Sequence, residues 1–177
     1  NIAIVGATGN VGRKLLEVLE RTNFEFSEIY LIASDKSVGK KITFKNKNYS
    51  VIGLSDFDFG KVKLAFFSAG SSIAEKWAPI AAKKTIVIDN SKYFRMDKEI
   101  PLVVPEVNSD ALKLYKNKNI IANANCSTIQ LVLALKPLHD QFKIKRVIVS
   151  TYQSVSGAGK VHMNELEEQS KLVLEKQ

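Results

Sequence analysis

The chain has 177 residues, of which 45% are hydrophobic and 25% charged, a composition typical of a globular protein with one domain and part of another. Its net charge is +8, but the lysines are scattered without interleaved aromatic residues, so we expect a small anionic ligand and no nucleic-acid partner. One cysteine excludes an intrachain disulfide framework, and no run reaches the ~18 apolar residues of a membrane span, so we expect a cytoplasmic protein with no membrane partner.

The first residues predict a strand, a glycine-rich turn and a helix. Residues 2–5 are a short apolar run, typical of a strand buried on both faces, and apolar residues recur at helical spacing from Val11 to Leu19. Between them lies the turn Gly6-Ala7-Thr8-Gly9-Asn10-Val11-Gly12. Glycines let a pyrophosphate approach the backbone, and the N–H groups at the start of a helix bind it. The segment therefore predicts a dinucleotide site with the spacing G-x-x-G-x-x-G, a variant of the usual fingerprint.

The end of the second predicted strand, residues 29–33, bears on the identity of the cofactor. When NAD is bound, an acidic residue about 20 positions after the glycines holds the ribose hydroxyls. The chain reads Ser34-Asp35-Lys36-Ser37 at this point, and hydroxyl groups beside a lysine suit the 2′-phosphate of NADP. We therefore favour NADP, while Asp35 keeps NAD open.

The central part of the chain adds a hairpin and two buried strands. Residues 41–44 and 49–52 flank the polar loop Lys45-Asn46-Lys47-Asn48, which predicts an antiparallel hairpin. Residues 64–68 and 85–89 are apolar runs of strand length. Buried strands that alternate with helices indicate a Rossmann-like, doubly wound and mostly parallel sheet.

A helix at about residues 73–84 follows the strand at residues 64–68, and Ser71 or Ser72 is expected to cap it. The polar loop after residue 89 contains Arg95, which could clamp a carboxylate or a phosphate through two parallel hydrogen bonds. Most arginines on surface loops have no such role, and the loop by itself favours that simpler interpretation.

The only cysteine, Cys126, lies where the apolar run 119–122 ends and the helical pattern of residues 128–138 begins. The first N–H groups of a helix lack intrahelical partners and carry partial positive charge, which favours the thiolate, the reactive form of cysteine. A lone cysteine is more often a small buried apolar residue. Other features must therefore decide whether Cys126 is a nucleophile.

The pattern changes after Cys126. Residues 143–152 alternate partly between polar and apolar types, which predicts a long strand in a sheet with one wet face. A glycine-serine turn at residues 153–159 precedes a helix that we expect to run to the end of the chain. We predict a dinucleotide-binding Rossmann-like domain at residues 1–125 and the beginning of an α+β domain at residues 126–177.

Several common catalytic patterns are absent from the sequence. His139 and His162 are the only histidines, so the sequence contains no H-E-x-x-H motif and no Cys/His cluster for zinc, and we expect no metal. The serine-hydrolase motif G-x-S-x-G is missing. None of the five tyrosines has a lysine four positions later, which excludes the Tyr-x-x-x-Lys pair of short-chain dehydrogenases.

Six segments taken in order are far more specific than any one motif. They are Gly6-Ala7-Thr8-Gly9-Asn10-Val11-Gly12, Phe67-Ser68-Ala69-Gly70-Ser71-Ser72, Asp89-Asn90-Ser91 with Phe94-Arg95, Val103-Val104-Pro105-Glu106-Val107-Asn108, Asn125-Cys126-Ser127-Thr128 and Ser150-Thr151-Tyr152-Gln153-Ser154-Val155-Ser156-Gly157. This ordered set closely resembles the aspartate-semialdehyde dehydrogenase family of the bacterial type. The resemblance runs along essentially the whole chain and corresponds to the N-terminal half of such an enzyme.

The resemblance implies NADPH-dependent reduction of L-aspartyl 4-phosphate to L-aspartate 4-semialdehyde and phosphate through a cysteine acyl-thioester, in lysine (diaminopimelate), methionine and threonine biosynthesis. It makes Cys126 the catalytic nucleophile. The substrate-binding residues that it implies are Arg95, Asn125 and Gln153, which reverses the simpler interpretation of Arg95. The cofactor-binding residues that it implies are Gly6, Thr8, Gly9, Asn10, Val11, Lys36, Ser37, Ser156 and Gly157.

The resemblance also implies a second domain that is catalytic and forms a homodimer, or a dimer of dimers. The family's acid–base histidine and a substrate-binding arginine lie further along than residue 177, so we expect this chain to bind cofactor and to be incomplete for catalysis. Two alternatives stay open. One is an enzyme of the N-acetylglutamyl-phosphate reductase type, which is less similar around the cysteine, and the other is a non-catalytic NADP-binding regulatory module.

Overall fold

A computed structural model of the protein describes residues 1–175. The chain divides into two compact units, Asn1–Ile144 and Lys145–Gln177, and each is described by itself. Within residues 1–175, no helix has both the length and the apolar character needed to cross a membrane.

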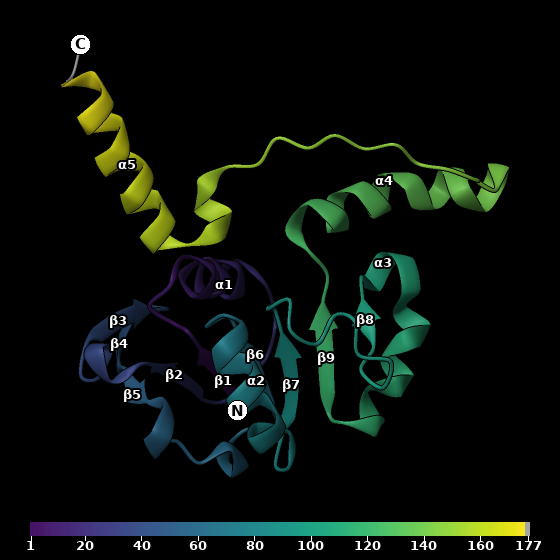
Figure 1. The fold of residues 1–177 in the computed structure, drawn as a ribbon. Coiled ribbons are helices and arrows are strands. Elements are labelled where there is room, and N and C mark those ends of the chain that lie inside the picture. The colour runs from purple at the N-terminus through teal and green to yellow at the C-terminus, as the bar shows by residue number, and fades with distance from the viewer. Residues whose placement is uncertain (176–177) are drawn as a thin grey trace. The chain divides into compact units, whose positions relative to one another are not determined.

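A seven-stranded parallel sheet forms the centre of the first unit (Figure 1). Its strands are β1 (Ile2–Val5), β2 (Ile29–Ala33), β5 (Ile52–Gly53), β6 (Leu64–Phe67), β7 (Ile86–Asp89), β8 (Leu102–Val103) and β9 (Ile120–Asn123). Their order across the sheet is β5-β2-β1-β6-β7-β9-β8, and every neighbouring pair is parallel. The chain passes from β1 to β2 on one side and later to β6 on the other, so a topological switch point lies between β1 and β6. Doubly wound folds bind ligands at the carboxyl end of such a switch point.

Helices lie on both faces of this sheet. The α-helices of the chain are α1 (Asn10–Arg21), α2 (Ser71–Ala82), α3 (Pro105–Asn108), α4 (Cys126–Phe142) and α5 (Lys160–Leu174). Successive side chains of a strand point to opposite faces, and β1 buries both: Ile4 shares a core cluster with Leu16 of α1, and Val5 shares the other cluster with Ala78 of α2. The predicted Rossmann-like, doubly wound sheet is therefore confirmed.

The predicted hairpin is also present, with a shorter loop than expected. It consists of β3 (Lys41–Phe44) and β4 (Lys47–Ser50), which pair antiparallel. Only Lys45 and Asn46 form the turn, and both have positive φ angles of 46° and 60°. Because two consecutive left-handed residues close a two-residue hairpin, β4 begins two residues earlier than the sequence predicted.

The predicted serine cap of α2 is wrong. The N-cap residue is Gly70, which has a φ angle of +89°, and it makes no side-chain cap hydrogen bond. Ser71 is already the first helical residue. The left-handed backbone at residue 70 favours glycine over serine, so the turn geometry takes precedence over side-chain capping here.

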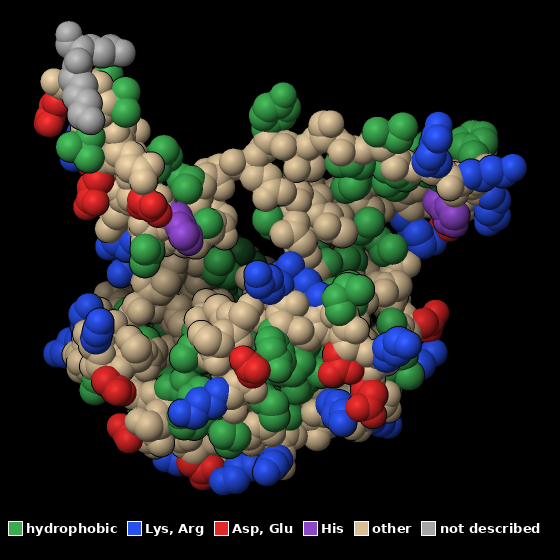
Figure 2. Space-filling model, viewed as in Figure 1, with side chains coloured by type: hydrophobic (Ala, Val, Ile, Leu, Met, Phe, Trp, Pro, Cys, Tyr) green, Lys and Arg blue, Asp and Glu red, His purple; other side chains and the backbone are tan. Residues whose placement is uncertain are grey.

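The second unit contains the 3₁₀ helix η5 (Val155–Ala158) and the helix α5, with its apolar side chains exposed. Figure 2 shows hydrophobic side chains along this part of the chain, and those with a large exposed fraction include Ile148, Tyr152, Val161, Leu166 and Leu174.

The strand predicted at residues 143–152 is wrong, because the described residues form no strand there. A strand needs a neighbour to pair its N–H and C=O groups, and the described chain offers none at this point. Residues 176 and 177, where the last helix was predicted to end, lie outside the described residues.

Candidate active site

The candidate site lies at the carboxyl edge of the sheet, where the segments that follow β1, β6, β7 and β9 meet (Figure 1). The edge is held together by backbone hydrogen bonds between neighbouring segments. Ser68 N donates to Val5 O at 2.8 Å, and Asn90 N donates to Phe67 O at 2.9 Å. Because all these strands are parallel, residues far apart in the sequence come together here.

The glycine turn after β1 has a shape that excludes side chains. Gly6 has a φ angle of +91°, and a Cβ atom there would lie 2.8 Å from the carbonyl carbon and oxygen of Ser68. A Cβ atom on Gly12 would lie 2.3 Å from the carbonyl oxygen of Gly6. Helix α1 therefore packs directly against the turn, and only glycine fits at these two positions.

The N-terminus of α1 is accessible at this edge. Gly9 is the N-cap residue, so no side chain caps the helix. Asn10 and Val11 are exposed, while Thr8 is half-buried. A helix start with an accessible backbone next to a glycine turn fits the pyrophosphate of a dinucleotide, because the first N–H groups and the helix dipole both attract anions.

The segment after β2 lies beside this turn, because β2 is the neighbour of β1. It forms the 3₁₀ helix η1 (Asp35–Ser37). Lys36 is exposed there, whereas Ser37 is only 8% exposed. Lys36 is thus the more accessible of the two residues predicted to read a 2′-phosphate.

Cys126 is the first residue of α4 and is exposed. Asn125 is the N-cap residue, and its Oδ1 accepts hydrogen bonds from Ser127 N at 3.1 Å and from Ser127 Oγ at 2.6 Å. The cap uses the oxygen of the Asn125 amide, so its nitrogen is the atom suited to donate to an anion. The thiol lies at the same edge of the sheet as the glycine turn, outside the apolar core.

Arg95 bridges the carboxyl ends of β7 and β9. Its Nε donates to Asn123 O at 3.0 Å, and its Nη2 donates to Asn90 O at 3.1 Å. The side chains of these two asparagines also meet, because Asn123 Nδ2 donates to Asn90 Oδ1 at 2.7 Å. Arg95 is therefore fixed by the edge of the sheet, close in space to the segment that leads into Cys126.

Asp89 lies beneath the loop that carries Arg95 and is fully buried. Its carboxylate accepts hydrogen bonds from Ser91 N at 3.1 Å and from Ser91 Oγ at 2.6 Å. Burial raises the pKa of Asp89 above its usual value, although the Ser91 hydrogen bonds and the charge of Arg95 act in the opposite direction. The carboxylate orders the first turn of the loop through Ser91.

The sequence-based prediction gave Asp89, Asn90 and Asn123 no role in the site, although Asp89 and Asn90 belong to one of the six segments that carry the resemblance. The signal that could have found them is their position, since each is polar and ends or follows a buried strand. In an open parallel sheet such positions border the ligand crevice.

The glycine turn and the cysteine segment lie at the same edge of the sheet but not next to each other. β6 and β7 separate β1 from β9, which at ~4.8 Å per strand puts the glycine turn and the cysteine segment roughly 14 Å apart. An extended dinucleotide can bridge such a gap. Gln153, Ser156 and Gly157 are exposed residues of the second unit, which is described by itself, and their roles stay predictions.

Two family models match the chain. The model described as the NAD binding domain of semialdehyde dehydrogenase matches residues 1–115, and the model described as the semialdehyde dehydrogenase dimerisation domain matches residues 135–177. The predicted boundary at residues 125 and 126 lies between the two matches and stays a prediction.

Individual relatives agree with the family models. An aspartate-semialdehyde dehydrogenase of Rickettsia bellii is 51% identical over 172 residues, which cover 97% of this chain and 51% of the relative. The crystal structure of aspartate semialdehyde dehydrogenase II from Vibrio cholerae complexed with ASA matches with a TM-score of 0.94 at 50% identity, over 99% of this chain and 53% of that one. The enzyme from Candida albicans with NADP matches with a TM-score of 0.68 at 30% identity, over 81% and 47%.

The chain spans about half the length of the curated relatives that it matches. The first family model alone covers well over half of the chain, and it includes strands β1 to β8, the glycine turn and the loop that carries Arg95. These matches confirm the resemblance expected from the motifs: the chain belongs to the semialdehyde dehydrogenase family.

Proposed function

We propose that this chain supplies the cofactor-binding domain and the nucleophile of an aspartate-semialdehyde dehydrogenase. The protein would reduce L-aspartyl 4-phosphate to L-aspartate 4-semialdehyde and phosphate, with NADPH as the reductant, in lysine, methionine and threonine biosynthesis. The observation that carries this proposal is the position of Cys126, exposed at the first residue of α4 and next to the segment that anchors Arg95. The names of the relatives support the choice of substrate.

The chemistry assigned to this chain is acyl transfer to sulfur. The Cys126 thiolate attacks the carbonyl carbon of the acyl phosphate, a C–S bond forms, and the C–O bond to phosphate breaks, so that phosphate leaves with the electron pair. Arg95 would bind that phosphate, because a guanidinium can donate two parallel hydrogen bonds to phosphate oxygens. The Asn125 amide nitrogen would add a third donor.

The residues at the carboxyl edge fit a dinucleotide. Gly6, Thr8, Gly9, Asn10 and Val11 would hold its pyrophosphate, and Lys36 would pair with a 2′-phosphate beside Ser37. When bound, NADPH supplies the hydride that reduces the thioester. In the second unit, Gln153 would contact the substrate, and Ser156 and Gly157 would face the cofactor.

The proposal extends to assembly and location. A family model for the dimerisation domain matches residues 135–177, which supports assembly of the whole protein as a homodimer or a dimer of dimers. An enzyme of this metabolism with a lone free cysteine in this part of its chain fits a cytoplasmic location.

Alkylation of Cys126 by iodoacetamide tests the proposal in the whole protein. The label is followed by mass spectrometry of the peptide that contains residue 126, which separates it from any other thiol. We expect labelling near neutral pH to be about ten times faster than that of a free peptide with residues 123–128, because the folded helix start stabilises a thiolate. Aspartate semialdehyde and phosphate together should protect the thiol.

Two variants serve as controls. Cys126→Ser should abolish both the label and turnover while NADP binding persists, since the hydroxyl is a far weaker nucleophile and the exposed side chain supports no core packing. Lys47→Ala, on the exposed hairpin, should leave labelling unchanged. Slow labelling that substrate does not slow further would contradict the proposal and favour a non-catalytic module.

A further inference from the structure

The side chains of Asn90 and Asn123 take part in a closed ring of hydrogen bonds with Arg95. Arg95 donates to the backbone carbonyls of both asparagines, at 3.0 Å to Asn123 O and at 3.1 Å to Asn90 O. The third side of the ring is the 2.7 Å bond from Asn123 Nδ2 to Asn90 Oδ1. Each asparagine therefore binds the guanidinium with its backbone and the other asparagine with its side chain.

The sheet register creates this ring. β7 and β9 are parallel neighbours, and Asp89 pairs with Ala122. The next residue on each strand is then an asparagine, so Asn90 and Asn123 reach the carboxyl edge side by side. The hydrogen bond between their side chains continues the pairing of the two strands beyond the last backbone bond.

The ring leaves Arg95 able to bind an anion. A guanidinium has five N–H groups, and the two bonds to backbone carbonyls use two of them. Both acceptors are neutral carbonyls. Among residues 1–175, no carboxylate lies within hydrogen-bond distance of the guanidinium, so its positive charge has no directly paired partner. Arg95 is half-buried, and its orientation is fixed by carbonyls on two different strands.

We propose that Asn90 and Asn123 are positioning residues that hold the Arg95 guanidinium at the phosphate site and fix its place relative to Cys126. Asn123 ends β9, and Cys126 begins α4 three residues later, so the carbonyl that anchors Arg95 and the thiol belong to one short segment. If the side-chain bond is lost, Arg95 alone links Asn90 to Asn123, so the two carbonyls that hold the guanidinium are less firmly fixed relative to each other. This inference rests on the proposed role of Arg95 in phosphate binding.

The test uses inorganic phosphate as the probe in the whole protein. Two readouts are combined: the phosphate concentration that protects Cys126 from iodoacetamide, and the KM for phosphate in the oxidation of aspartate semialdehyde. We expect Asn123→Ala and Asn90→Ala each to weaken phosphate about five-fold by both readouts, since a hydrogen bond between neutral side chains contributes about 1 kcal/mol. NADP affinity should stay unchanged.

Two combinations separate positioning from a general loss of structure. The double variant Asn90→Ala/Asn123→Ala should be no worse than either single variant, because both remove the same bond. In an Arg95→Ala background, Asn123→Ala should have no further effect on phosphate. The exposed amide of Asn48, which accepts from Thr43 Oγ1 at 2.8 Å on the hairpin, gives the control Asn48→Ala, with no expected change.

The outcomes distinguish this inference from the proposed function. If Arg95→Ala weakens phosphate but neither asparagine variant does, the positioning role is overturned and the proposed function stands. If Asn123→Ala is equally harmful with and without Arg95, the asparagine does not act through the arginine, which also overturns the inference. If Arg95→Ala leaves phosphate protection unchanged, both proposals fail.

Discussion

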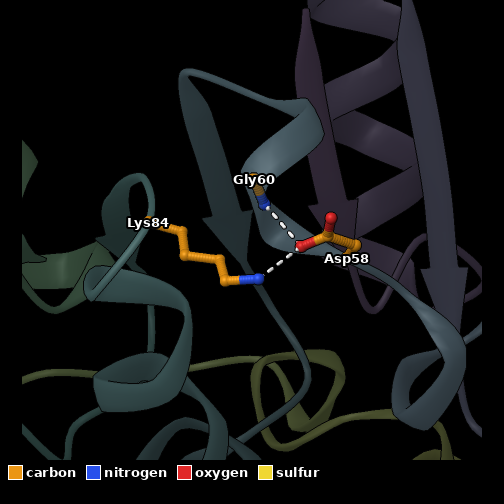
Figure 3. Close-up of polar contacts among 3 residues, drawn as sticks. All are labelled: Asp58, Gly60 and Lys84. Atoms are coloured by element: carbon orange, nitrogen blue, oxygen red, sulfur yellow. Dashed lines mark hydrogen bonds and ion pairs between the residues drawn. The ribbon is translucent and has the colours of Figure 1, made fainter.

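At the amino edge of the sheet, Asp58 accepts hydrogen bonds from Gly60 N at 3.0 Å and from Lys84 Nζ at 2.8 Å, and all of these groups are exposed (Figure 3). At the carboxyl edge, Asp89 also accepts two hydrogen bonds, but it is fully buried beneath the loop of Arg95. Both carboxylates organise a tight turn next to a strand. The two carboxylates differ in their contact with water. Water screens the charge of Asp58 but is excluded from Asp89.

This difference in exposure to water distinguishes polar groups that only stabilise a surface turn from polar groups that can orient a functional side chain. The exposed pair at Asp58 gains little, because its charges interact through solvent and are screened by salt. The buried carboxylate must be held by its hydrogen bonds, and it acts on Arg95 in a medium of low dielectric constant. Changes at the carboxyl edge should accordingly have large effects and changes at the amino edge small ones.

The largest effect is expected at Gly6. Gly6→Ala should lower the free energy of unfolding by about 3 kcal/mol or more and abolish NADP binding, because the new Cβ atom meets the Ser68 backbone and the φ angle is positive. Gly39 is the matched control, since its φ angle is +78° but no heavy atom lies within 4 Å of a Cβ there. Gly39→Ala should therefore lose only about 1 kcal/mol and keep NADP binding. Chemical denaturation and NADP titration measure both, and equal losses in the two variants would refute the steric argument.

Ser91→Ala should have an intermediate effect. It removes the 2.6 Å hydrogen bond to the buried Asp89 carboxylate, and a bond of this kind to a charged group contributes about 2 kcal/mol. The control is Ser55→Ala, because Ser55 Oγ donates to the Asp56 carboxylate at 3.3 Å on the surface, where we expect little change.

The same variant should alter the pH dependence of stability. Burial raises the folded-state pKa of Asp89, so the folded protein binds a proton more tightly than the unfolded chain does, and this contribution to stability decreases as the pH rises through the folded-state pKa. Because the Ser91 bonds lower that pKa, Ser91→Ala should extend the decrease to higher pH. Urea unfolding across pH 4 to 8 measures it, and parallel curves for the two proteins would exclude the effect.

The smallest effect is expected at Lys84. Lys84→Met removes the cation beside Asp58, and the midpoint of thermal unfolding should change by about 2 °C or less, with a still smaller change in 1 M NaCl. Lys84 lowers the pKa of Asp58, so the pair contributes above the usual Asp value and its contribution disappears as the pH falls through the folded-state pKa. A change above about 5 °C at high salt would show that the amino edge is not screened as described.

Much of the fold followed from the sequence because local signals agree with burial. The strands at residues 2–5 and 29–33 have the predicted bounds, since each is an apolar run that ends in a glycine or polar turn. Predictions failed where the outcome depends on the backbone or on a distant partner. Gly70 displaced the serine cap of α2 through its positive φ angle, and residues 143–152 have no strand to pair with among the described residues.

The candidate site was only partly predictable for a related reason. The roles of Cys126 and of the glycine turn can be predicted from residue type and from the neighbouring sequence. The ring around Arg95 depends on the register of β7 against β9, which no local pattern encodes. Asn90 and Asn123 are ordinary polar residues until that register places them together.

The segment from Asn123 to Cys126 has a consequence for how this chain tolerates changes in length. One end carries the carbonyl that accepts a hydrogen bond from Arg95, and the other end carries the thiol. Three peptide units, each spanning ~3.8 Å between Cα atoms, therefore set the distance between them. An inserted or deleted residue in this segment would shift the sulfur by up to ~3.8 Å relative to the guanidinium. Insertions should therefore accumulate in the exposed two-residue turn of the hairpin and be excluded from this segment.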